Sequence, residues 1–247
     1  MIDTHCHLDD PRYDPDRAAC WEHARQRGIQ GLVIPGVSVH NWGAVRGIAR
    51  SLGLAFGLGT HPQALPELRP ENPWLPEDLS EACAIGECGL DGGVPVPMEL
   101  QEQVLAAHLE RSRDTGLPLL LHAWRCHDRL LPLLRRFAPL HGVLHSYSGG
   151  AQLVAPYAAL GLHFSFAGAI TWEGARRPVE ALRAVPRDRL LVETDGPDQC
   201  PRPHRGRSEP AFLVEVVEAM ERLRAEPLRR CLLENAQALF PRVTPAS

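Results

Sequence analysis

Residue types that bind metal ions recur at regular places in this sequence, beginning with the triplet His5-Cys6-His7. Residues two apart in a β-strand face the same side, so both imidazoles could reach one ion while Cys6 points the other way into packing. Imidazole and carboxylate ligands together suit divalent metals, and zinc, manganese, magnesium, nickel and iron are all candidates. Further side chains of these types follow or end other short apolar runs: His61, Glu87, His122, His145 and Asp195.

The basic residues limit how two metal ions could share this site. All 26 of them are arginine, so a bridging carboxylated lysine, a P-loop lysine and Schiff-base chemistry are excluded. Two ions about 3.5–4 Å apart need a bridging group, which must then be a native carboxylate. Glu87 is the best candidate, because it stands between the histidine pair near the N-terminus and the later histidines.

Eight short apolar runs could supply the strands that position these residues. Each is four to eight residues long and bounded by Gly, Pro or charged residues, as is typical of buried parallel strands. The runs are residues 2–8, 31–37, 54–60, 82–88, 117–122, 142–146, 162–166 and 189–194.

Helical patterns lie between or after these runs, at residues 16–27, 98–115, 128–137, 176–184, 209–224 and 227–239, with Pro227 expected in the first turn of the last helix. The alternation predicts an α/β fold, a (β/α)8 TIM barrel that uses residues 1–247 as a single domain. In such a barrel all candidate ligands meet at the C-terminal ends of the strands. A doubly wound open sheet is the runner-up, although no Gly-rich turn follows the first run. Residues 62–80 are expected to form an irregular loop.

Composition narrows the classes of function. The net charge of −4 argues against a general nucleic-acid-binding surface, but a nucleic-acid substrate remains compatible with it. Seven cysteines without CxxC spacing indicate reduced thiols and a cytoplasmic protein. We expect no signal peptide, no membrane span and no obligate protein partner. A Ser-His-Asp triad using Ser146 or Ser148 near His145 is disfavoured, because the sequence has no GxSxG turn.

These motifs resemble the TatD family of metal-dependent hydrolases and deoxyribonucleases, an amidohydrolase-like branch of barrels, over essentially the whole chain. The similar segments are Ile2-Asp3-Thr4-His5-Cys6-His7-Leu8-Asp9, Gly59-Thr60-His61-Pro62, Ile85-Gly86-Glu87-Cys88-Gly89-Leu90-Asp91, Leu117-Pro118 ahead of His122, His145-Ser146-Tyr147-Ser148-Gly149, Glu193-Thr194-Asp195-Gly196-Pro197, Arg205-Gly206, and Asn235 ahead of Leu239-Phe240.

The resemblance implies a metal centre with assigned roles. His5, His7, Glu87 and Asp195 would hold one ion, and Glu87, His122 and His145 would hold the second. Asp195 would also orient the attacking water and accept its proton, so Asp195 and Glu87 are the expected catalytic residues.

The sequence departs from the family pattern only where substrate would be held. Gly92-Gly93 stands where the family usually has aromatic residues, and Trp124 stands where it often has an arginine, with Arg125 one position later. The family's asparagine after Arg205-Gly206 is replaced in the region of Ser208-Glu209-Pro210.

The expected function is metal-assisted hydrolysis of a phosphodiester, in DNA first of all. Arg125, Arg205 and Arg207 are candidate phosphate contacts, and His61 is a candidate for orienting substrate or for fixing its loop. Two alternatives stay open. The same centre could hydrolyse an amide, lactone or ester of a small molecule, or the chain could bind metal without catalysis.

Overall fold

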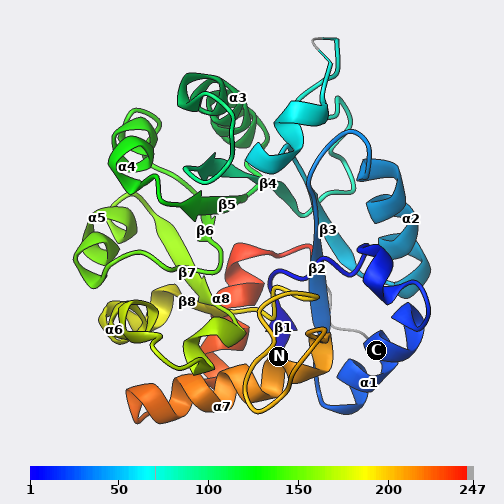
Figure 1. The fold of residues 1–247 in the computed structure, drawn as a ribbon, viewed down its shortest axis with the longest axis vertical. Helices are drawn as coiled ribbons and strands as arrows, with labels where there is room; N and C mark the ends of the chain where they lie inside the picture. Colours follow the sequence, from blue (N-terminus) through cyan, green and yellow to red (C-terminus); the bar gives the residue numbers. More distant parts are fainter. Residues whose placement is uncertain (70, 244–247) are drawn as a thin grey trace.

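Eight parallel strands form the centre of the molecule in a computed structural model that describes residues 1–69 and 71–243. Each strand pairs with the next one along the chain, from β1 to β8, and most of the helices surround them on the outside (Figure 1). The strands are β1 (Ile2–Asp3), β2 (Gly31–Gly36), β3 (Ala55–Leu58), β4 (Ala84–Asp91), β5 (Leu119–Trp124), β6 (Gly142–Leu144), β7 (Leu162–Phe166) and β8 (Leu190–Val192).

Backbone hydrogen bonds bring the first and last strands of the barrel together. The Thr4 N–H donates to Val192 O at 3.2 Å, and the Asp195 N–H donates to His5 O at 2.9 Å. The predicted (β/α)8 barrel is therefore confirmed. The doubly wound alternative is wrong, because its strand order would reverse at a switch point instead of following the chain.

The helices are α1 (Arg17–Gln26), α2 (Trp42–Leu52), α3 (Met98–Thr115), α4 (His127–Arg135), α5 (Val154–Ala158), α6 (Arg176–Ala184), α7 (Leu213–Arg224) and α8 (Arg229–Leu239). Most of them cover the outer face of the strands, whereas α8 lies over one end of the barrel, where its Ala236 and Leu239 pack with Ile2 and Val33 from inside it (Figure 1). The sequence patterns predicted α3 and α6 with the observed bounds and missed α2 and α5. Pro227 lies before the N-cap residue Leu228, so it is not in the first turn of α8 as expected.

Several strands differ in extent from the predicted runs. β1 ends at Asp3, and residues 4–7 continue as a loop whose backbone bonds to both neighbouring strands. β4 continues to Asp91, so Glu87 lies inside it and does not end it. The expected irregular loop contains a 3-10 helix at Pro62–Glu67, and Pro70 in that loop lies outside the described residues. In the described part of the chain, no helix is long and apolar enough to cross a membrane.

His108 on α3 links the outer helix layer to the loop after β3. The ring is fully buried, its Nε2 accepts the Thr60 N–H at 2.9 Å, and its Nδ1 lies 2.7 Å from Val104 O. Because one nitrogen accepts and the other faces a carbonyl, the ring is neutral with its proton on Nδ1. Burial lowers the pKa of His108 to about 4.

This histidine should make the fold sensitive to acid. The pKa of an unfolded histidine is about 6.5, so the unfolded chain binds more protons than the folded chain as pH falls from 6.5 to 4. The stability from neutral His108 is present above pH 6.5 and is lost as pH falls towards 4, by up to about 3 kcal/mol. We expect His108→Gln to flatten the pH dependence of the free energy of unfolding, measured by urea titration. The exposed-residue control His40→Gln should keep the wild-type slope, and equal slopes in all three proteins would contradict the assignment.

Candidate metal centre

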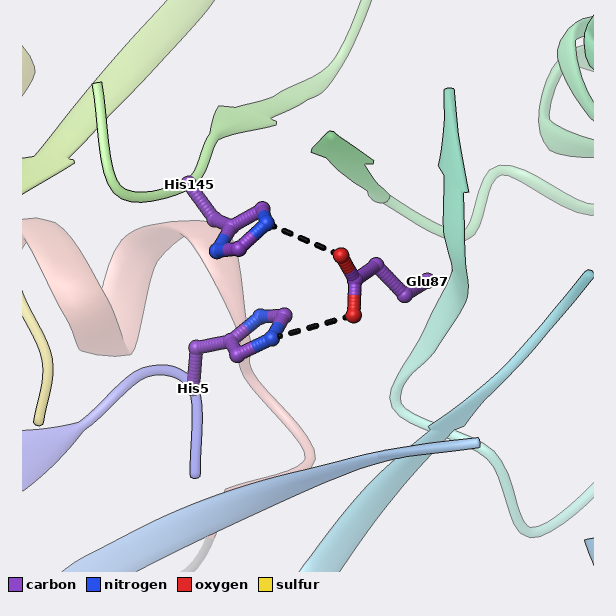
Figure 2. Close-up of side chains that lie close together, drawn as sticks. All are labelled: His5, Glu87 and His145. Atoms are coloured by element: carbon purple, nitrogen blue, oxygen red, sulfur yellow. Dashed lines mark ion pairs between the residues drawn. The ribbon is translucent and has the colours of Figure 1, made fainter. Parts of the chain in front are cut away.

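Seven imidazole and carboxylate side chains meet at the C-terminal ends of the strands. The sequence singled out all seven, and the structure brings them together from six strands. His5 and His7 follow β1, His61 follows β3, Glu87 lies in β4, His122 lies in β5, His145 follows β6 and Asp195 follows β8. Figure 2 shows Glu87 reaching between His5 and His145.

One oxygen of Glu87 faces the first pair of histidines. Glu87 Oε2 lies 3.3 Å from His5 Nε2 and 3.4 Å from His7 Nε2, and these two nitrogens are 3.3 Å apart. Asp195 Oδ1 lies slightly farther away, 3.8 Å from His5 Nε2 and 3.9 Å from His7 Nε2. The four side chains thus form one group of potential ligands around a common point.

The other oxygen of Glu87 faces a second pair of histidines. Glu87 Oε1 lies 2.9 Å from His145 Nε2 and 3.3 Å from His122 Nδ1, and these two nitrogens are 3.3 Å apart. A single carboxylate therefore joins two triangles of potential ligand atoms, one on each oxygen.

These triangles fit metal ions. Tetrahedral ligands at zinc distances of about 2.0–2.1 Å stand about 3.3–3.4 Å from one another, which is close to most edges of both triangles. Three groups of three side chains in this centre have ligand atoms that all lie within 4.8 Å of one another. These groups are His5-Glu87-His145, His5-His7-Asp195 and His61-Glu87-His122. The donor set thus fits one or two divalent ions bridged by Glu87.

The electrostatics differ among these groups. Burial lowers the pKa of His7, His122 and His145, but the carboxylates around them raise it more, to about 9 in His7, so a bound cation would have to displace protons there. Glu87 and His5 are already in the forms that suit a cation. Burial raises the pKa of Glu87, but the imidazoles of His61, His145 and His5 lower it more, so that the net value is well below the ordinary one. Burial lowers the pKa of His5 to about 4, which keeps its ring neutral. Ionised carboxylate and neutral imidazole are the forms that bind metal ions.

An irregularity in β4 places Glu87 in the centre. The register with β5 shifts between Ile85 and Cys88, as in a β-bulge, which turns the intervening side chain. Gly86 is required there, because its φ is +131° and an added Cβ would lie 2.6 Å from Leu120 O.

A family model described as "TatD related DNase" matches residues 2–241. The chain belongs to the TatD family. It is 32% identical to the "Uncharacterized metal-dependent hydrolase YjjV" of Escherichia coli K12, with 97% of each chain covered. It is 34% identical to the "3'-5' ssDNA/RNA exonuclease TatD" of Erwinia billingiae, over 97% of this chain and 98% of that protein.

The solved structures include a TatD homologue of the same shape. The crystal structure of Escherichia coli YjjV matches with a TM-score of 0.89 and 30% identity, covering 98% of both chains. The predictions of family membership and of a metal-dependent hydrolase are thus confirmed, and the alternative of a metal-binding protein without catalysis is not supported.

The TatD site also contains two carboxylates behind the histidines, which were not among the residues predicted from the sequence. Asp91 Oδ2 lies 3.2 Å from His122 Nε2, and Asp91 Oδ1 accepts the Gly93 N–H. Glu193 is fully buried, accepts the Ser146 N–H at 2.5 Å and lies 3.4 Å from His145 Nδ1. Such carboxylates fix the ring orientation of metal-binding histidines. Asp91 and Glu193 could have been found in the sequence, because they lie in the same motifs as Glu87 and Asp195.

His61 is arranged as a hydrogen-bond donor. Its Nδ1 accepts the Gln63 N–H at 3.1 Å, so the neutral ring carries its proton on Nε2. That Nε2 lies 3.2 Å from Glu87 Oε1. Burial lowers the pKa of His61, which favours this neutral form.

Gln199 is a further residue of the TatD site that the sequence did not indicate. Its Nε2 donates to Asp195 Oδ2 and, at 2.5 Å, to Ser146 Oγ. Asp195 Oδ1, the oxygen nearer His5 and His7, is thereby kept facing the centre. Among the described residues, no hydrogen bond joins His145 to a serine hydroxyl, so the Ser-His-Asp triad is not formed.

The three candidate phosphate contacts differ in availability. Arg207 is held by ion pairs with Asp16 and Glu209. Arg205 lines a pocket of about 370 Å³ and makes no ion pair among the described residues. Arg125 is exposed, with its guanidinium 5.4 Å from the centre of the Trp124 ring. Arg205 and Arg125 are thus free to approach substrate, whereas the guanidinium of Arg207 is occupied by its two ion pairs.

Proposed function

We propose that this TatD family member hydrolyses phosphodiester bonds, with DNA or RNA ends as its substrate. The main support for this proposal is that the two oxygens of Glu87 face two separate histidine pairs. His5, His7, Glu87 and Asp195 would hold one divalent ion, and Glu87, His122 and His145 would hold a second. Bound ions would supply Lewis acidity, which acidifies water and neutralises charge on phosphoryl oxygens.

The remaining steps fall to protein side chains. Asp195 orients a water with Oδ1 and takes its proton, while Gln199 holds Oδ2. His61, whose Nε2–H faces Glu87 Oε1 in the structure, would turn this donor towards substrate charge, and Arg125 and Arg205 would contact phosphates along the strand. We also propose a cytoplasmic location, which is supported by seven cysteines that are all free thiols.

The proposal predicts a complete dependence on metal. Chelated protein should release no nucleotide from a single-stranded oligonucleotide, and add-back of single divalent ions should restore release, measured by gel electrophoresis. A parallel panel of aryl esters and lactones tests the small-molecule alternative, which the apolar pocket beside the centre would suit. Nuclease activity that survives chelation, or ester hydrolysis without any nuclease activity, would overturn the proposal.

A further inference from the structure

A pocket of about 410 Å³ opens directly beside the metal centre. His122, His145 and Asp195 line both this pocket and the smaller cavity of about 210 Å³ that contains Glu87 and His61. Its volume lies in the usual range for pockets that bind small molecules. A group attached next to the reacting bond would therefore enter this pocket.

The lining of the pocket is mostly apolar and includes two indoles. Trp124 and Trp172 both line it, and each is 42% exposed. Trp172 is fixed in place, because its Nε1 donates to Cys200 O at 2.9 Å. Large apolar side chains this exposed are few in the described part of the chain, and two of the four lie here. Exposed aromatic faces that gather at a pocket indicate a ligand.

Charge separates this pocket from its neighbour. No arginine lines it, and apart from the metal-centre residues its one charged lining residue is Glu173. The neighbouring 370 Å³ pocket shares Trp172 and Gln199 with it and is lined by four arginines and by Asp198, which pairs with Arg12. Two of these arginines, Arg202 and Arg205, make no ion pair among the described residues. The first pocket thus suits a flat uncharged group, and the second suits a phosphate.

We propose that the pocket between Trp124 and Trp172 binds the base of the terminal nucleotide by stacking. The inference rests on the proposed phosphodiesterase function and adds how the strand end is held. The base lies against an indole, the reacting phosphate lies at the metal centre, and the next phosphate lies near Arg202 and Arg205. Because every base has a π face, this contact recognises any base, and the base must leave a duplex to reach it.

The test compares oligonucleotides that differ only in the terminal base. A single strand with a normal end and the same strand with an abasic end are hydrolysed by wild type, Trp172→Leu and Trp124→Leu. Trp74→Leu is the matched control, because Trp74 is 37% exposed and does not line the pocket. Wild type and the control should favour the normal end by about tenfold or more in kcat/KM. Both pocket variants should lose this preference while keeping the rate on the abasic end.

A binding measurement separates the failure of this inference from the failure of the proposed function. In calorimetry, wild type and Trp74→Leu should bind adenosine 5'-monophosphate more tightly than ribose 5-phosphate. Trp172→Leu should bind the two phosphates with equal affinity. Hydrolysis of both oligonucleotides at equal rates, with equal binding of the two phosphates, would overturn the stacking pocket alone. No hydrolysis of either oligonucleotide by metal-loaded wild type would overturn the phosphodiesterase function, and the strand-end inference with it.

Discussion

Glu87→Gln is expected to lower kcat/KM at least about 100-fold and to leave at most one tightly bound metal ion. Loss of a partner behind a metal ligand alone costs about 10–100-fold, and Glu87 is proposed to be a ligand itself. The amide keeps one oxygen, but its NH2 group must face either His5 and His7 or His122 and His145, where it cannot bind a cation. Metal content by mass spectrometry and steady-state kinetics measure both effects.

The surface variant Glu81→Gln is the control for Glu87→Gln. Glu81 is an exposed carboxylate paired with Arg50, and it lines neither the metal centre nor the pocket beside it. The Glu81→Gln protein should bind the same number of ions as wild type and hydrolyse substrate at the wild-type rate. A Glu87→Gln protein that retains two ions and full activity would show that this carboxylate is not the bridge.

Asp195→Asn is expected to separate chemistry from metal binding. Removing a general base typically costs about 10²–10⁴-fold in rate. The loss of metal affinity should be smaller than in Glu87→Gln, because His5, His7 and Glu87 remain around the first ion and Asp195 is the most distant of the four. Metal titration, together with kcat and KM on an oligonucleotide, makes the comparison. If Asp195→Asn and Glu87→Gln lose metal equally, Asp195 is a metal ligand and has no separate role in proton transfer.

The parts of the fold that the sequence predicted are those with local signals. The apolar runs predicted the eight strands of the barrel, and the glycine after α3 predicted where that helix ends. α2 was missed because Gly43 and Gly47 weaken its helical pattern, and α5 because five residues are too few to show a period.

Features that depend on distant contacts were not predictable in the same way. The bulge at Glu87 follows from the fit of Gly86 against Leu120, 34 residues later in the sequence numbering. Gln199 belongs to the site because its amide reaches both Asp195 and Ser146. The candidate ligands were predictable because parallel strands bring their C-terminal ends to one face, whatever the detail of the pairing.

The seam of the barrel has a consequence for how the protein matures. The contacts that close it join residues nearly 200 positions apart, as where Thr194 Oγ1 donates to Asp3 across 191 positions. Such long-range contacts form late, after the chain between them has been ordered. A growing chain on the ribosome contains His5 and His7 long before it contains Asp195, which lies 190 positions after His5. In the proposed centre, the first ion would therefore gain its full set of ligands only after Asp195 has been made and the barrel has closed.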